Sequence, residues 1–75
     1  MKMETVDLAG IARAGGQLVL DAADYKPGDL EAIARAGAKA GGGLHVRNAQ
    51  RLSASECMAI TRASGGAGRV ILDLS

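Results

Sequence analysis

The sequence predicts a small α/β domain in which three tandem helix–strand units form a three-stranded parallel sheet. Three observations predict this fold class. Short apolar segments recur at an interval of 26 residues, a glycine-rich stretch precedes each of them, and a helix-like segment with an Ile-Ala/Thr-Arg-Ala core precedes each glycine stretch. Self-similarity of this kind indicates a repeat architecture. We expect a single domain over residues 1–75, with repeats at about 5–23, 27–49 and 53–75.

The three predicted helices have apolar or small residues spaced three and four apart, as one buried helix face requires. These inward positions are Leu8, Ile11 and Ala12, then Leu30, Ile33, Ala34 and Gly37, then Cys57, Ile60 and Ser64. We expect Thr5 to cap the first helix and Pro27 to lie in the first turn of the second. Ser53 and Glu56 have the spacing of a capping box at the third. The glycines that follow each helix suit a left-handed C-cap.

The three predicted strands alternate between two faces. The face expected to be buried carries Leu18, Leu20, Ala22, Leu44, Val46, Asn48, Val70, Leu72 and Leu74. A helix between consecutive strands implies parallel pairing through right-handed crossovers. A strand order of 1-2-3 then places every helix on one side of the sheet and leaves the other side open.

Two rows of side chains should cross this open face. Because the strands repeat every 26 residues, Asp21, Arg47 and Asp73 become neighbours on successive strands. The second row consists of Val19, His45 and Ile71. Opposite charges on adjacent strands favour cross-strand pairing, which contributes about 0.2–1 kcal/mol per contact.

Residues 44–60 combine a strand, a short turn, a second leucine at Leu52 and a helix. In this order, and in their period, they resemble leucine-rich repeats of the helical, ribonuclease-inhibitor type. The chain departs from that pattern after its strands, where the family's Asn or Cys would fall at Ala23 and Ala49. The resemblance implies a solenoid that binds protein on its open strand face.

The amino-acid composition argues against several classes of binding site. Cys57 is the only cysteine and His45 the only histidine, so an intramolecular disulfide is excluded and no metal-ligand cluster is recognisable. A net charge of +1 with dispersed charges gives no basic footprint for nucleic acid. No apolar run approaches the roughly 18 residues of a membrane span, and the start of the chain lacks a secretory signal. We expect a soluble, cytoplasmic protein without cofactor, metal, nucleic-acid or membrane binding.

No catalytic constellation is evident. The glycines run from helix to strand, the reverse of a phosphate-binding loop. Cys57 has no evident base and is expected to be a buried thiol, and His45 has no nucleophile partner. The carboxyl ends of the strands, where α/β enzymes often hold their sites, offer only Ala22, Ala23, Asp24, Asn48 and Ala49. We therefore predict that the protein is not an enzyme.

The open face admits two interpretations at each position. His45 is either a pH-sensitive contact or a solvated strand histidine. The arginine–aspartate row is either a recognition patch or a charge ladder that keeps the sheet soluble. Val19 and Ile71 either seed a dimer face or are ordinary exposed apolar surface.

The third strand, residues 69–74, forms an edge of the predicted sheet, and such edges template pairing with another chain. A domain of 75 residues is also close to the lower limit for a self-sufficient core. Two copies could pair antiparallel in a closed dimer, or stack head to tail and extend the solenoid.

We therefore expect a non-enzymatic protein-interaction or self-assembly module, most simply a homodimer, or one that binds another protein. The residues expected to make the contact are Val19, Asp21, His45, Arg47, Arg69, Ile71 and Asp73. The alternative is a domain that binds a small ligand or a peptide around His45 and Arg47.

Overall fold

The computed structural model of the chain describes residues 3–65 and 69–74. Helices and strands alternate along the chain, as the sequence predicted. In order they are α1 (Thr5–Arg13), β1 (Gln17–Asp21), α2 (Pro27–Gly37), β2 (Gly43–Arg47), the 3-10 turn η1 (Ala49–Arg51), α3 (Ala54–Ala63) and β3 (Val70–Leu72).

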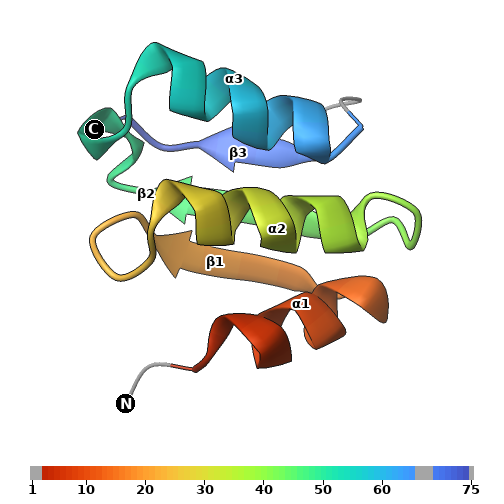
Figure 1. Cartoon of the computed structure of the whole chain (residues 1–75). Helices are drawn as coiled ribbons and strands as arrows, with labels where there is room; N and C mark the ends of the chain where they lie inside the picture. The colour runs from red at the N-terminus through yellow and green to blue at the C-terminus, as the bar shows by residue number, and fades with distance from the viewer. Residues whose placement is uncertain (1–2, 66–68, 75) are drawn as a thin grey trace.

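The three strands form one open parallel sheet in the order β1-β2-β3. Leu18 lies opposite Leu44, and Leu44 lies opposite Val70, so each strand is paired with an offset of 26 residues. The three helices form a single layer over one side of this sheet (Figure 1). The predicted strand order, strand direction and one-sided helix layer are therefore confirmed.

The hydrophobic core lies between the helix layer and the sheet. Its buried residues are Leu8, Ala12, Leu20, Leu30, Ile33, Ala34, Leu44, Val46, Ala49 and Ile60. Helix α2 packs against both α1 and α3 (Figure 1). All four of its predicted inward residues are buried, because it has a neighbour on each side.

The helix ends follow from local sequence with one exception. The Ser53 Oγ accepts a hydrogen bond from the Glu56 N–H at 3.2 Å, and Glu56 Oε1 accepts one from the Ser53 N–H at 2.8 Å, which confirms the capping box. Pro27 is the first residue of α2, as predicted. The prediction for Thr5 is wrong, because Thr5 is already helical and Glu4 occupies the N-cap without a side-chain cap.

A left-handed glycine directly follows the C-caps of α1 and α3, as predicted, whereas at α2 it comes three residues after the C-cap Ala38. Gly15, Gly41 and Gly65 have φ angles of 92°, 76° and 82°. A side chain at such a φ would be strained, which explains why glycine occupies these positions. Among the other described residues, only Asn48 has a positive φ, at 57°.

Two inward predictions fail, both at the margins of the fold, because Ile11 is 39% exposed and Leu74 is exposed beyond the end of β3. The thiol of Cys57, expected to be buried, is only half-buried. Strand β3 is also shorter than residues 69–74. The alternation along each element was right, but no described element covers α1 or α3 on its outer side.

Candidate functional site

The open side of the sheet presents the row of side chains that the strand offset predicted. The register places Val19 opposite His45, and His45 opposite Ile71. Val19 is 63% and Ile71 56% exposed, and neither is covered by the helix layer. Two apolar side chains therefore flank the only histidine on an uncovered surface.

Asp21 is held by hydrogen bonds at the end of β1. The register places it opposite Arg47, as predicted. Its carboxylate accepts hydrogen bonds from Asn48 Nδ2 at 2.7 Å and from the Ala23 N–H at 2.8 Å. These bonds, with a smaller contribution from the Arg47 charge, lower the pKa of Asp21 below its usual value of 3.8.

Asn48 connects the ends of β1 and β2, although the sequence pattern only placed it on the buried face. Its left-handed backbone lets the chain leave β2 and enter η1, and asparagine tolerates this conformation better than most residues. From this turn its side chain reaches across to Asp21 and joins the ends of β1 and β2. The sequence feature that could have indicated this role is an Asn directly after a strand, one position earlier than in the leucine-rich-repeat pattern.

His45 lies near Asp73 without a hydrogen bond between them. The His45 Nε2 atom is 3.9 Å from Asp73 Oδ2, beyond hydrogen-bonding distance but close enough for an ion pair if the imidazole is protonated. That Nε2 atom is shielded from solvent, although both side chains are more than a third exposed. Asp73 lies just beyond the end of β3, where its backbone bonds to Val46 and Ala49. The strand register therefore pairs Asp21 with Arg47 as predicted but does not extend the charged row to Asp73.

Arg69, one of the residues predicted to make an interaction, bonds within the chain. Its guanidinium donates a hydrogen bond to the Ala38 carbonyl, just beyond the end of α2, and is partly buried there. The long side chain reaches from the start of β3 to a helix carbonyl that needs a donor. Arg69 therefore ties β3 to the helix layer.

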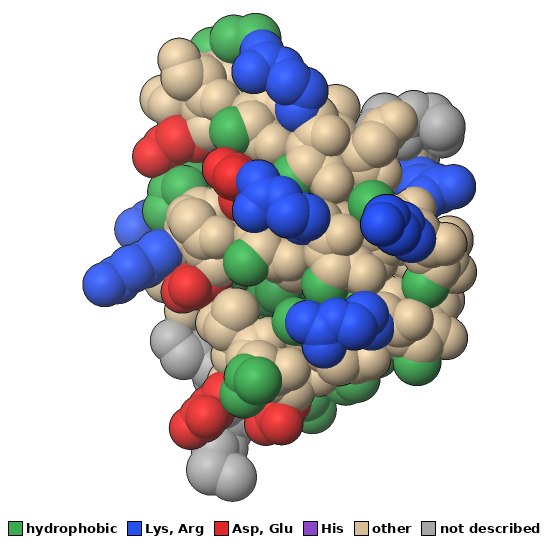
Figure 2. Space-filling view, turned by 45° about the vertical axis from the view of Figure 1, so that its right-hand side comes forward, with side chains coloured by type: hydrophobic (Ala, Val, Ile, Leu, Met, Phe, Trp, Pro, Cys, Tyr) green, Lys and Arg blue, Asp and Glu red, His purple; other side chains and the backbone are tan. Residues whose placement is uncertain are grey.

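The outer surface of the helix layer is polar. The last turns of α1, α2 and α3 contain Arg13, Arg35 and Arg62. A positive charge there interacts favourably with the negative end of the helix dipole. Arg35 also pairs with Glu31 at 2.7 Å. Figure 2 shows Lys and Arg side chains spaced apart over this side of the molecule, without merging into one patch.

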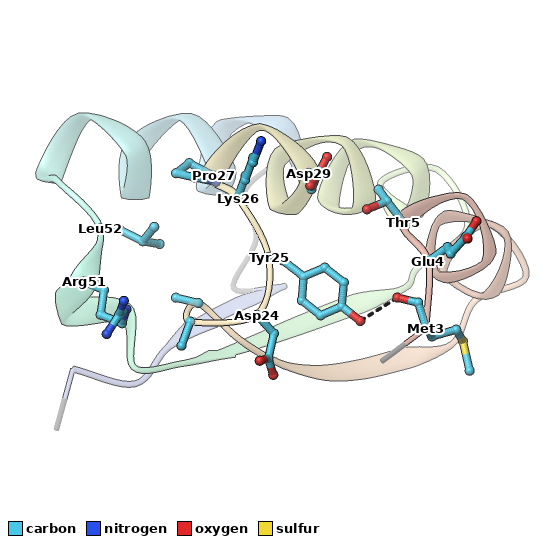
Figure 3. A pocket seen from close by; sticks show the side chains of 12 residues that line it. Met3, Glu4, Thr5, Asp24, Tyr25, Lys26, Pro27, Asp29, Arg51 and Leu52 are labelled. Atoms are coloured by element: carbon cyan, nitrogen blue, oxygen red, sulfur yellow. Dashed lines mark hydrogen bonds between the residues drawn. The ribbon is translucent and has the colours of Figure 1, made fainter. Parts of the chain in front are cut away.

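A pocket of about 670 Å³ opens near the carboxyl ends of β1 and β2 (Figure 3). Tyr25 crosses it, and its hydroxyl donates a hydrogen bond to the Met3 carbonyl at 2.7 Å. Charges of both signs line the pocket, from Glu4, Asp24, Lys26, Asp29 and Arg51. Tyr25, the only aromatic residue, anchors the segment that leads into α1.

A second hollow of about 540 Å³ lies between α3 and β3, at the edge of the fold. We call it the α3–β3 groove, and it is lined by Cys57, Met58, Thr61, Arg62, Gly65 and Leu72. Met58 is exposed, and Cys57 and Leu72 are half-buried. This lining is mostly apolar, in contrast to the charged pocket beside Tyr25.

Within residues 3–65 and 69–74, no three His, Cys, Asp or Glu side chains are grouped to hold a metal ion. No helix in these ranges has the length and apolar character needed to cross a membrane.

Comparison with known proteins gave no relative. No protein-family model matches the chain, and neither curated proteins nor solved structures yielded a match.

Proposed function

We propose that the chain is a non-enzymatic protein-interaction module that associates with itself through the edge formed by α3 and β3. One observation carries the proposal. β3 is one of the two edge strands of the described sheet, and the exposed apolar residues Met58, Ile71 and Leu74 lie around it. An exposed strand edge with apolar surroundings is a template for another chain.

The backbone of β3 supports this choice of edge. The Arg69 carbonyl accepts from the Leu44 N–H and the Asp73 N–H donates to the Val46 carbonyl, both at 2.9 Å, so these residues turn toward β2. Backbone groups of a parallel strand point alternately to its two sides. Val70 and Leu72 therefore turn their N–H and C=O groups outward, where a further strand would satisfy them.

The small size of the domain gives association an energetic reason. The core holds few large apolar side chains, and six of its ten buried residues come from the middle of the chain between Leu30 and Ala49. Domains below about 80 residues commonly depend on a disulfide, a metal or a partner for stability. With a single cysteine, an intramolecular disulfide is excluded, and burial of the α3–β3 edge would add apolar area to the core.

We further propose that the three helix–strand units are leucine-rich-repeat-like and form a short solenoid. The constant offset of 26 residues between paired strands supports this proposal. The Asn48–Asp21 hydrogen bond supports it as well, because it ties adjacent strand ends together at the turn. A solenoid adds units along the direction in which its strands pair, and β1 and β3 are the two edges of the described sheet in that direction.

Light scattering over a range of concentrations tests the self-association. We expect the mass to rise above 7.6 kDa with concentration. Ile71→Lys should weaken association at least about tenfold, because it places a charge on an apolar contact at the edge. Ala32→Lys is the control, since Ala32 is an exposed residue of α2, the middle helix, away from both edges of the sheet. A monomer up to millimolar concentration would contradict the proposal.

Binding of a small ligand or peptide over the open face is the second candidate. It is favoured by a hollow of about 540 Å³ whose lining includes Val19, Asp21, Tyr25 and Arg47. Amide chemical shifts measured during titration with a glutamate-rich tetrapeptide would test it. Binding through the planar guanidinium predicts loss of the shifts in both Arg47→Ala and Arg47→Lys. Equal shifts in the wild type and both variants would exclude this role for Arg47.

A further inference from the structure

The two outer helices differ in which of their sides is uncovered. The shared isoleucine of the three helices is 39% exposed at Ile11 but only 1% exposed at Ile33 and Ile60. Ile60 is buried although no described helix follows α3, and Ile11 is exposed although α2 follows α1. The shared isoleucine therefore points toward the preceding helix, and α1 has no described helix before it.

The opposite side of each helix shows the reverse pattern. Leu8 and Leu30 are buried, whereas the matching residue of α3, Cys57, is half-buried. Ala12 and Ala34 are likewise buried, and their counterpart is the exposed Thr61. This side points toward the following helix, and at α3 it forms the wall of the α3–β3 groove.

From this complementarity we infer that the α3–β3 groove receives the α1–β1 end of a second copy of this chain, stacked head to tail. Ile11 of the second copy enters the groove, in the way that Ile33 is buried against α1 and Ile60 against α2. The inference rests on the proposed self-association and specifies its geometry. It is supported by the helix contacts within the chain, because α3 would pack on α1 of the second copy in the way that α1 packs on α2 and α2 packs on α3.

The strand register extends in the same way. Leu18 is opposite Leu44, and Leu44 is opposite Val70. One further step of the same offset brings Leu18 of the second copy opposite Val70. In this position β1 of the second copy satisfies the outward backbone groups of β3, while its helix α1 lies beside α3.

The wall of the groove is suited to an apolar occupant. Thr61 Oγ1 donates a hydrogen bond to the Cys57 carbonyl at 2.8 Å, so the only hydroxyl in the lining is already satisfied within its own helix. Covering it therefore leaves no unpaired hydroxyl. An antiparallel contact between two β3 strands would instead set groove against groove and leave Ile11 exposed in both copies.

Complementation between two blocked variants tests the arrangement. Ile11→Lys blocks the α1–β1 end of the chain, which we call the head, and Thr61→Lys blocks the α3–β3 groove. Both substitutions are at exposed positions. Because a head-to-tail contact does not close on itself, the wild type should grow beyond two chains as concentration rises. We expect each variant alone to associate at least about tenfold more weakly, and their equimolar mixture to form a dimer of twice 7.6 kDa.

Other outcomes separate the two proposals. If Ile11→Lys associates like the wild type, Thr61→Lys does not and their mixture gains nothing, the head-to-tail geometry is overturned and self-association stands. A wild type that remains monomeric overturns both. Ala14→Lys provides a second head variant in case Ile11→Lys fails to fold, because Ala14 is exposed at the C-cap of α1 on the same side as Ile11. It should also complement Thr61→Lys, and failure to do so counts against the inference.

Discussion

The middle and third helix–strand units have the same pattern of residues but different burial. Leu30 and Val46 of the α2–β2 unit are fully buried, whereas their counterparts Cys57 and Leu72 in the α3–β3 unit are half-buried. The pattern of a unit sets which face turns inward. The neighbours on either side set how deeply that face is buried.

The residue types at the outer boundary have shifted in a consistent direction. Leucine gives way to Cys57 and alanine to the exposed Thr61. These residues are somewhat more polar than their counterparts, and the hydroxyl of Thr61 donates to the Cys57 carbonyl of its own helix. The boundary is therefore able to face water and also to be covered, which suits a reversible contact better than a permanent one.

The largest test of this contrast is a matched pair of truncations. Leu30→Ala should destabilise the monomer by about 2–5 kcal/mol, because it leaves a cavity at a fully buried site. Leu72→Ala should have about half that effect, since its side chain is already partly in water. Urea unfolding at low protein concentration measures both. Equal losses of unfolding free energy would show that Leu30 and Leu72 are equally buried, which would contradict the contrast.

The parts of the fold that sequence predicted are those controlled by residues close together in the chain. The helix periodicity, the Ser53–Glu56 capping box and the glycine C-caps depend on neighbours within a few residues. The strand order also followed, because the 26-residue spacing and the intervening helices leave few topologies. The open face was predicted from the alternation of Val19 and Ile71 with buried neighbours.

The errors arose where burial or bonding depends on distant residues. The periodicity of α1 marks Ile11 as inward, yet no described helix lies on that side. The alternation in β3 marks Arg69 as outward, yet its side chain is long enough to reach the Ala38 carbonyl. The charges of Asp21 and Arg47 suggested an ion pair, but the carboxylate is bonded to Asn48 from the next turn. Each of these outcomes requires knowledge of what lies across the fold.

The turn at Asn48 gives the next test, on the boundary between the first and middle units. Asn48→Gly keeps the left-handed backbone and loses the bond to Asp21, whereas Asn48→Ala loses both. Asn48→Ala should be less stable than Asn48→Gly by about 1–2 kcal/mol, the penalty for a side chain in this conformation. Thermal unfolding followed by circular dichroism compares them. Equal stabilities would mean that the turn adopts another backbone conformation.

The two outer helices provide a smaller contrast at their first turns. Ser53→Ala removes a hydrogen bond that caps α3 and should destabilise the protein by about 1 kcal/mol. Thr5→Ala should change stability by no more than about 0.5 kcal/mol, because Thr5 lies within α1 and caps nothing. Chemical denaturation measures both values. A larger loss from Thr5→Ala would restore it as the cap of α1.

The smallest expected effect concerns acid. Because the pKa of Asp21 is lower in the folded protein, mainly through Asn48 and then Ala23, the folded state binds fewer protons than the unfolded chain near pH 3.8. This contribution to stability is present above that pH and is lost as the pH falls through the pKa of the folded state. Asp21→Asn should therefore show a shallower fall in melting temperature between neutral pH and pH 2 than the wild type. The pKa of Asp21, followed by carboxyl-carbon NMR, should rise toward 3.8 in Asn48→Gly. If it does not move, the bond between the strand ends is not what sets the acidity of Asp21.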